Sequence, residues 1–380
     1  MYKMFIENVH LDSNERLCSD PAADAIFQIL SGARNFKLLM HALEIGLFDE
    51  IAVFGEPITA ETAAKKFQFN AASFRRFLDT LVAMGLLKKE VSMKGRELYS
   101  NSSGTSKYLT RCRKPTLIAA ALMESNFVMP MLDILPLALK TGSSSINVMG
   151  TKKGVNTDKM DNVSNKPPQN TPPEMNEQKS ADKLMKFLLC MDGMAQPCAP
   201  SLVRAFDLSA HRNVVDLGGG SGSIALELAR TYPQTNVTIY DLPHVIQMAQ
   251  KIQRDVPSHV TFQGGNFFEE DLPDADLYIF AHVLHDWEEE KVDILLEKVH
   301  DKLPPGGSLL VLEKVLNERR DGPLLTVTSD LIMSLISKGK ERTESEYRKL
   351  FSKHGFSNTC VKTIEGVNYY DAILTKKPFC

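Results

Sequence analysis

The chain has 380 residues, of which 43% are apolar and 24% are charged, as is ordinary for a globular protein. This length is sufficient for two domains, each with its own core. The net charge of −3 gives no electrostatic case for a nucleic acid or an anionic membrane surface as a partner.

Cysteine usage and the first residues bear on the cellular compartment. The six cysteines are scattered, without a C-x-x-C pair or a zinc spacing, which favours a reducing compartment and predicts no metal site. Glu7 comes too early for a secretory signal, and no apolar run approaches the roughly 20 residues of a membrane span. We therefore expect a cytoplasmic protein.

The first third of the chain is predicted to be mainly helical. Residues 1–20 are expected to form a flexible arm, and apolar residues then recur at helical spacing from Ala22 to about Leu109. A short hairpin is predicted around Lys94 and Gly95. Helix, turn, helix and hairpin together resemble a winged helix.

A winged helix can bind DNA, or it can pack on itself or on a partner. Arg75 and Arg76 stand out on the second helix, but the segment lacks the basic stripe that duplex binding needs. We therefore favour packing over DNA binding.

The middle of the chain changes composition abruptly. A helix pair is predicted over Thr116–Leu139, but residues from about 142 to 180 are mostly Ser, Asn, Lys, Pro and Gly. Such a stretch cannot bury enough apolar area to order itself, so we expect a disordered polar insert. The expected domains are an arm (1–20), a winged-helix domain (21–141), the insert (142–180) and an α/β domain (181–380).

The last part of the chain has a regular α/β pattern. Five apolar strands alternate with helical stretches, which predicts a parallel sheet covered on both faces. Two further strands follow with a short connection, so the sheet is expected to end in an antiparallel hairpin. The fold class expected is α/β, with a Rossmann-like, mostly parallel sheet. The predicted strands are 213–217, 236–240, 260–263, 276–280, 308–312, 359–364 and 370–375.

A glycine-rich turn follows the first of these strands. Gly218, Gly220 and Gly222 alternate after Asp216, and Asp241 closes the next strand. Alternating glycines let the backbone approach a ligand, the next helix points its amides at that ligand, and a carboxylate suits a ribose diol. The pattern predicts a site for a nucleoside-bearing cofactor.

The glycine pattern alone leaves three interpretations open. Residues 220–225 satisfy the dinucleotide pattern G-x-G-x-x-A, which would suit a nicotinamide cofactor. The three alternating glycines after Asp216 instead resemble the first motif of S-adenosylmethionine-dependent methyltransferases. An ordinary tight turn is the third interpretation. Five parallel strands and a terminal hairpin resemble the methyltransferase layout, which favours S-adenosylmethionine.

A candidate general base follows the fourth strand. His285 precedes Trp287, the single tryptophan, at a strand end where open α/β sheets bind ligands. Its pKa near neutrality suits removal of a proton from a hydroxyl. A lone histidine there would more often be structural, and a lone glutamate a surface charge. Glu313 and Glu341, however, lie near neighbouring strand ends and could hold the imidazole by hydrogen bonds.

Separated segments agree in order and spacing with one family. The similarity runs from about Ala25 to the C-terminus, except for the insert. Together the segments resemble the small-molecule O-methyltransferases of the caffeate and acetylserotonin type. Within that family the chain is most similar to the acetylserotonin (hydroxyindole) branch, over residues 205–209, 274–278 and 321–326. The segments that carry the family resemblance are 216–222, 241–243, 265–268, 285–287, 304–307 and 339–343.

The resemblance implies a function and a role for each matching residue. It implies transfer of a methyl group from S-adenosylmethionine to a small aromatic hydroxyl compound, with a hydroxyindole as the first candidate, in a homodimer joined through the N-terminal domain. His285 would take the hydroxyl proton, flanked by Glu313 and Glu341. The implied cofactor contacts are Asp216, Gly218, Gly220, Gly222, Asp241, Leu242, Gly265, Asn266, Phe267 and His282, and the implied acceptor contacts are Asp286, Ile332, Met333 and Ile336.

Four residues and one segment depart from the family's pattern. Asn266 stands where the family usually has Asp, and His282 stands where it has Lys or Arg. Ile332 and Ile336 replace polar residues of the acetylserotonin enzymes, and the polar insert replaces an aromatic-rich segment that closes over the cofactor. These departures bear on turnover and on the acceptor more than on the fold.

Four functions other than hydroxyindole methylation follow from these observations. One is a winged-helix regulator, which would bind duplex DNA in a salt-dependent way and which we do not expect. A phenolic O-methyltransferase would keep the same chemistry on another acceptor, and a weak or silent protein would bind the cofactor without transfer. A nicotinamide dehydrogenase is the least favoured.

Overall fold

The computed structural model describes residues 20–111, 116–141, 173–366 and 369–379. It divides the chain between Ser106 and Lys107 into two compact units. The expected arm, apart from residue 20, and most of the expected insert lie outside the described residues. None of the described helices is long and apolar enough to cross a membrane.

The N-terminal unit combines helices with one hairpin, as predicted. Asn70 and Thr59 cap two of the helices with their side chains, and Gly46, in the left-handed conformation, is the N-cap of another. Arg75, considered above for DNA contact, pairs with Glu97 at 2.9 Å. The elements are α1 (Pro21–Glu44), α2 (Leu47–Phe54), α3 (Ala60–Phe67), α4 (Ala71–Ala83), β1 (Leu87–Val91), β2 (Glu97–Asn101) and α5 (Ser103–Tyr108).

The helices after residue 116 belong to the second unit, which corrects the expected boundary at 141. Their apolar side chains explain the difference, because Met131 and Ala138 bury themselves against Leu335 from late in the chain. A second correction is that the expected insert ends early, since residues 173–180 are helical. The elements are α6 (Ile118–Met123), η1 (Glu124–Val128), α7 (Met129–Leu132), α8 (Leu135–Thr141), α10 (Pro173–Ala195) and α11 (Ala199–Leu202).

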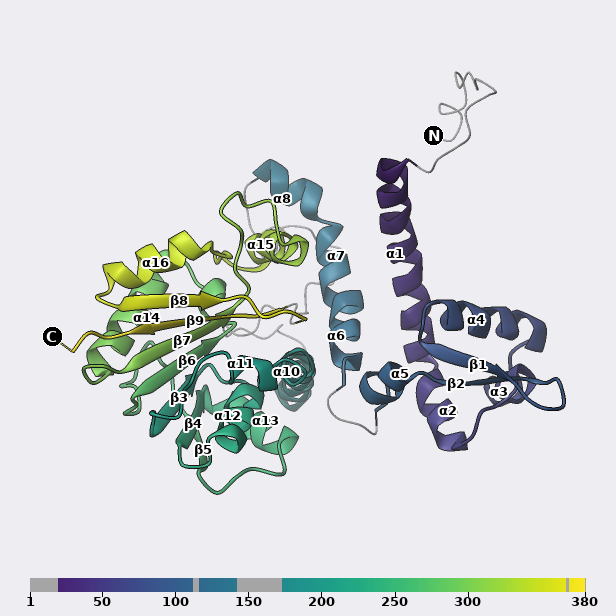
Figure 1. Cartoon of the computed structure of the whole chain (residues 1–380), viewed down its shortest axis with the longest axis horizontal. Helices are drawn as coiled ribbons and strands as arrows, with labels where there is room; N and C mark the ends of the chain where they lie inside the picture. Colours follow the sequence, from purple (N-terminus) through teal and green to yellow (C-terminus); the bar gives the residue numbers. More distant parts are fainter. Residues whose placement is uncertain (1–19, 112–115, 142–172, 367–368, 380) are drawn as a thin grey trace, which may run out of the picture. The chain divides into compact units, whose positions relative to one another are not determined.

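A seven-stranded sheet forms the centre of the second unit (Figure 1). Its order is β5-β4-β3-β6-β7-β9-β8, in which the first five strands are parallel and β9 is antiparallel to both β7 and β8. The predicted sheet and terminal hairpin are therefore confirmed. The strands are β3 (Asn213–Leu217), β4 (Asn236–Asp241), β5 (Val260–Gly264), β6 (Leu277–Ala281), β7 (Ser308–Glu313), β8 (Ser357–Lys362) and β9 (Asp371–Lys376).

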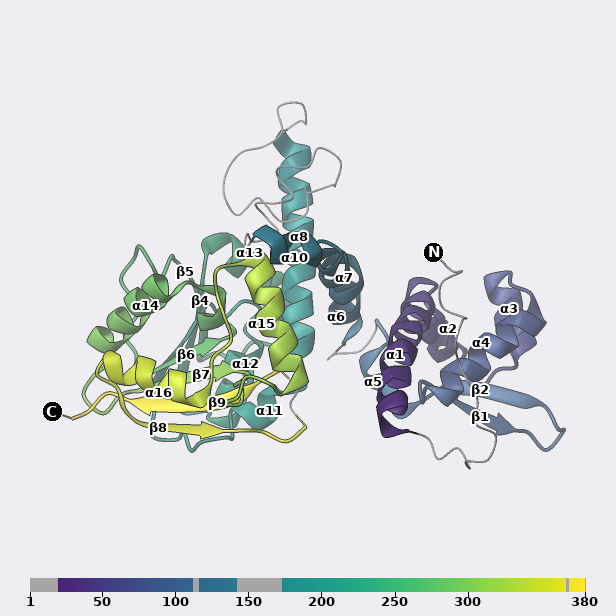
Figure 2. The same cartoon turned by 90° about the horizontal axis from the view of Figure 1, so that it is seen from above.

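Helices cover both faces of this sheet (Figures 1 and 2). Successive strand residues point to opposite faces, so Val214 and Ile279 belong to one core cluster while Val215 and Tyr278 belong to the other. Burial on both sides fixes the strands, and thereby the loops at their carboxyl ends. The covering helices include α12 (Ser223–Thr231), α13 (Pro243–Ile252), α14 (Glu289–Lys302) and α16 (Glu344–Lys353), while α15 (Leu324–Ile336) follows β7.

Candidate active site

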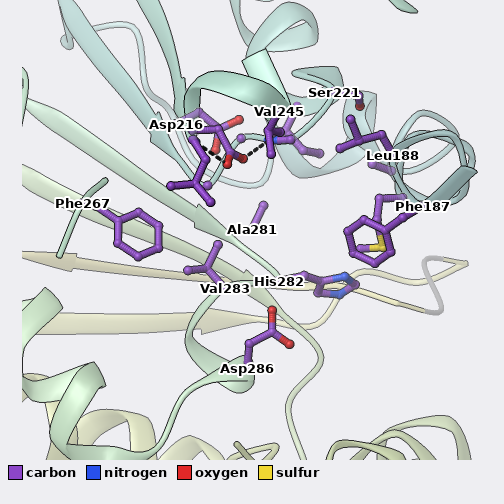
Figure 3. A pocket seen from close by; sticks show the side chains of 18 of the residues that line it. Phe187, Leu188, Asp216, Ser221, Val245, Phe267, Ala281, His282, Val283 and Asp286 are labelled. Carbon is purple, nitrogen blue, oxygen red and sulfur yellow. Dashed lines mark hydrogen bonds between the residues drawn. The ribbon is translucent and has the colours of Figure 1, made fainter. Parts of the chain in front are cut away.

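A pocket of about 390 Å³ opens at the carboxyl ends of the parallel strands (Figure 3). The glycine-rich turn forms one side of it and α10 another, and the segments after β4, β5 and β6 complete the lining together with Tyr370. Predicted cofactor residues that line it are Asp216, Gly218, Gly220, Asp241, Leu242, Gly265, Asn266, Phe267 and His282, together with the predicted acceptor residue Asp286.

The glycine-rich turn has the geometry that its sequence predicts. Gly218, Gly220 and Gly222 have φ values of 72°, 53° and 83°, a region that side chains disfavour. Asp241 fixes the turn, because its Oδ2 accepts a hydrogen bond from the Gly220 N–H at 2.9 Å. Gly222 does not line the pocket; a Cβ there would overlap Ile239, so its place is explained by helix–strand packing.

Two carboxyl groups line this pocket, that of buried Asp216 and that of half-buried Asp241. Burial, together with the charge of Asp241, raises the pKa of Asp216 to about 7. Burial also raises the pKa of Asp241, although hydrogen bonds from the Gly220 and Leu242 amides oppose the rise. Within the described chain Asp216 Oδ1 has no hydrogen-bond partner, and such an atom is usually satisfied by a ligand or water.

The segment after β5 supplies an aromatic wall. A Cβ at Gly265 would overlap the Tyr240 hydroxyl, so only glycine fits there. Asn266 Oδ1 accepts the Phe268 N–H at 3.0 Å, which leaves one lone pair of the amide oxygen for a ligand. Phe268 packs edge-on against Trp287 with ring centroids 4.8 Å apart.

The wall formed by α10 was missed by the sequence reasoning. Leu184, Phe187, Leu188 and Met191 of this helix line the pocket. Their helical spacing was the available signal, but the polar insert just before them gave no indication that the helix would pack over the turn.

His285 lies on the short helix η2 (Leu284–Asp286), just after β6. Its Nδ1 is 2.9 Å from Glu341 Oε1, which also accepts a hydrogen bond from Ser329 Oγ at 2.7 Å. On the other side of the ring, Nε2 is 3.6 Å from Asp286 Oδ1. The predicted pairing of His285 with Glu341 is present in the structure.

Glu313 holds the backbone of η2, and the hydrogen bonds found for it among the described residues do not include one to the imidazole ring, in contrast to the expected bond. Its Oε1 accepts hydrogen bonds from the Val283 and His285 N–H groups, both at 3.1 Å. Its Oε2 accepts the Tyr347 hydroxyl. As the last residue of β7, it lies beside the turn that follows β6, which places its carboxylate under those amides.

The two histidines near the pocket differ in charge. Burial disfavours the protonated form of His285, but the carboxylates of Asp286, Glu341 and Glu313 outweigh it and raise its pKa to about 10. Burial and the charge of His285 lower the pKa of His282 to about 4. His282 has its Nε2 2.9 Å from the Tyr369 carbonyl oxygen and is therefore a neutral polar group in the pocket wall.

The other predicted acceptor residues lie on α15, outside the pocket lining. Ile332 and Ile336 are partly buried against the cluster of Met131, Ala138 and Leu335. Met333 is also partly buried. Their contact with an acceptor stays a prediction.

Comparison with known proteins identifies the class. Residues 173–357 match the model of the O-methyltransferase domain, and residues 27–111 match that of the O-methyltransferase dimerisation domain. The chain belongs to the O-methyltransferase family, and it is an S-adenosylmethionine-dependent enzyme of that family.

The similar proteins include acetylserotonin O-methyltransferases, as the motifs predicted. The chain is 32% identical to the enzyme of Gallus gallus, over 93% of this chain and 96% of that one. It also resembles the crystal structure of human N-acetylserotonin methyltransferase in complex with SAM, with a TM-score of 0.80, 30% identity and coverage of 97% and 100%. A tetracenomycin polyketide 8-O-methyltransferase of Streptomyces glaucescens is 29% identical over 90% and 93%.

The residues present fit S-adenosylmethionine and do not favour a dinucleotide. Among the described residues that line the pocket there is no Lys or Arg, whereas two carboxyl groups are present, those of buried Asp216 and half-buried Asp241. A pyrophosphate is anionic and would be repelled by this arrangement, while a sulfonium is a cation and would be attracted. The nicotinamide interpretation is therefore not supported by the pocket.

Proposed function

We propose that this enzyme methylates the hydroxyl group of a small aromatic compound, with N-acetylserotonin or a related hydroxyindole as the first candidate and His285 as the general base. The observation that carries the proposal is the pair of His285 and Glu341, set beside the cofactor pocket at the carboxyl ends of the strands. When bound, S-adenosylmethionine supplies an electrophilic methyl group.

The two ring nitrogens of His285 have different tasks in this proposal. Nδ1 donates a hydrogen bond to Glu341, so the free lone pair of the neutral ring lies on Nε2. Because the pKa of the ring is raised to about 10, this neutral form grows as the pH rises toward that value, and the rate of transfer should rise with it. Nε2 takes the proton of the acceptor hydroxyl as the oxygen becomes a nucleophile. The imidazolium that forms is stabilised by Glu341 and by Asp286.

Positioning is the second contribution of the chain. Glu313 fixes the backbone that carries His285, so the base cannot drift from its place. Because methyl transfer needs the attacking oxygen in line with the methyl group, holding the base and the acceptor lowers the barrier mainly through orientation.

The acceptor class is argued from residues beside the base. Asp286 is about half exposed and lines the pocket, where it could accept a hydrogen bond from the acceptor. Ile332, Met333 and Ile336 offer an apolar surface to an aromatic ring. The Gallus gallus and human relatives named above support a hydroxyindole, while the polyketide relative and the two isoleucines support a phenolic acceptor as the second candidate.

A panel of acceptors tests the proposal. The enzyme is incubated with methyl-labelled S-adenosylmethionine and with hydroxyindoles, simple phenols and polyketide phenols. We expect labelled product with hydroxyindoles. Transfer to phenols alone would show that the acceptor is a phenol and not a hydroxyindole. Cofactor binding without transfer to any acceptor would support the silent binding protein instead.

A further inference from the structure

Asp192 of α10 is a buried carboxylate that the proposed chemistry does not use; only 5% of the residue is exposed. Its Oδ1 accepts hydrogen bonds from Ser221 Oγ at 2.9 Å, from Gln253 Nε2 at 3.0 Å and from Ser223 Oγ. Its Oδ2 accepts Gln196 Nε2 at 2.6 Å. All four of these partners are neutral donors.

These donors come from separate elements. Ser221 belongs to the glycine-rich turn, Ser223 begins α12, and Gln253 follows the last residue of α13. A buried carboxylate without such donors would be costly, so the arrangement is stable only when α10 sits at one place against the turn. One side chain thus joins α10 to the turn and to two helices behind it.

Asp192 lies where two walls of the cofactor pocket meet. It follows Met191, a lining residue of α10, and it binds Ser221, a lining residue of the turn. A Cβ added to Gly220 would lie 3.6 Å from Leu188 Cδ2, so the Leu188 side chain of α10 lies beside the turn there. Figure 3 shows Ser221 and Leu188 at this end of the pocket.

The next residue, Gly193, packs α10 closely against another segment of the chain. A Cβ at Gly193 would overlap the carbonyl oxygen of Thr116, which precedes α6. The helix therefore packs against both this segment and the glycine-rich turn. Asp192 supplies the hydrogen bonds to the turn, and Gly193 allows the close approach to the segment.

We propose that Asp192 is a positioning residue of the S-adenosylmethionine site: by tying α10 to the glycine-rich turn it sets the spacing of the two walls, and hence the affinity for the cofactor. It acts through Ser221 and Ser223. The inference rests on the cofactor site alone and needs neither the acceptor nor the role of His285, so binding measured without an acceptor tests it separately.

Three variants of the full chain separate positioning from general damage. Asp192→Ala removes the acceptor of four hydrogen bonds, whereas Asp192→Asn keeps an oxygen for the hydroxyl donors. Asp276→Ala is the matched control, because Asp276 also ties separate segments together, accepting the Arg212 N–H at 2.8 Å, but at the opposite end of the sheet.

The probe is S-adenosylhomocysteine, titrated by calorimetry. We expect the dissociation constant to rise about tenfold in Asp192→Ala, less than about threefold in Asp192→Asn, and not at all in Asp276→Ala. With a working acceptor, the KM for the cofactor should rise in Asp192→Ala while kcat changes by less than about twofold.

Two results would overturn the inference. One is an unchanged dissociation constant in Asp192→Ala; the other is equal loss in Asp192→Asn, which would assign the effect to charge and not to hydrogen bonding. If Asp192→Ala does not fold, Ser221→Ala and Ser223→Ala replace it, each with an expected rise of about threefold. Unchanged affinity in both serine variants would equally refute it.

Discussion

His285 and Glu341 are 56 positions apart, yet their side chains share a hydrogen bond at 2.9 Å. The carboxylate both fixes the ring and favours its protonated form. The pKa of Glu341 is lowered in turn, because the bond from His285 and its charge outweigh burial. The orientation and the pKa of His285 are thus both set by contacts with neighbouring carboxylates.

Replacing Glu341 by Gln should therefore move the pH dependence of catalysis. The substitution removes a negative charge that raises the pKa of His285, so this pKa should fall. Only the neutral imidazole accepts a proton, and so the rising limb of kcat/KM against pH should shift to lower pH, by about 1 pH unit. Methyl transfer is measured across the pH range.

Ser329→Ala is the control for this shift. It removes the second donor to Glu341 Oε1 but keeps the carboxylate, so its limb should stay close to that of the unaltered enzyme. A limb that stays in place, or moves to higher pH, in Glu341→Gln would contradict the assignment of His285 as the base.

The role of Glu313 shows what single residues do not reveal in sequence. Its place at a strand end was readable from the apolar run before it. Which atoms it meets depends on the register of β6 and β7 and on the turn after β6, and neither is encoded by the residue type. Sequence reasoning therefore identified the residue but assigned its hydrogen bond to the imidazole, whereas the bonds found among the described residues go to backbone amides and to Tyr347.

At the scale of elements, the glycine-rich turn depends on close packing of α12 against β4. Gly222 combines a φ of 83° with a site where a Cβ would overlap Ile239. Gly366 has a similar φ of 74°, but there a Cβ would meet open space. Substituting Gly366 therefore tests the cost of the left-handed backbone alone, whereas substituting Gly222 adds the cost of overlap with Ile239.

Substitution of these two glycines by alanine should have unequal costs. We expect Gly366→Ala to lower the free energy of unfolding by about 1 kcal/mol, from the left-handed conformation alone. Gly222→Ala should lower it by about 3 kcal/mol, because overpacking is added. Urea unfolding of both variants measures the difference, and equal losses would show that Ile239 yields without cost.

Strands and helices of the second unit were predictable because their apolar residues follow a clear period. The exception is α10, which begins at Pro173 inside the expected insert. Residues 173–180 are mostly polar, so their composition resembles that of the insert before them. The same limit hid the α10 wall of the pocket, since tertiary packing and not local pattern decides which segment covers a turn.

At the scale of the whole molecule, the N-terminal unit leaves apolar side chains uncovered on α1. Ile26, Phe27, Ile29 and Leu30 are all more than half exposed. This helix lies at the start of the segment that matches the dimerisation domain of the family. We propose that α1 contributes to a homodimer interface, where burial of these side chains would stabilise the pair.

Charges on α1 should then disrupt the assembly. We expect Phe27→Glu combined with Ile29→Glu to give monomers in analytical ultracentrifugation, at concentrations where the unaltered chain is dimeric. Met93→Glu, on an exposed residue of the hairpin turn, should remain dimeric. If the double variant is still dimeric, α1 does not form the interface. If the unaltered chain is monomeric, the homodimer itself is refuted.

The central claim is that His285 takes the proton of the acceptor. The most direct test measures methyl transfer from labelled S-adenosylmethionine by His285→Ala, alongside calorimetric binding of S-adenosylhomocysteine to the same variant. The account predicts that transfer falls by at least about a hundredfold while the cofactor still binds. Turnover equal to that of the unaltered enzyme would contradict it.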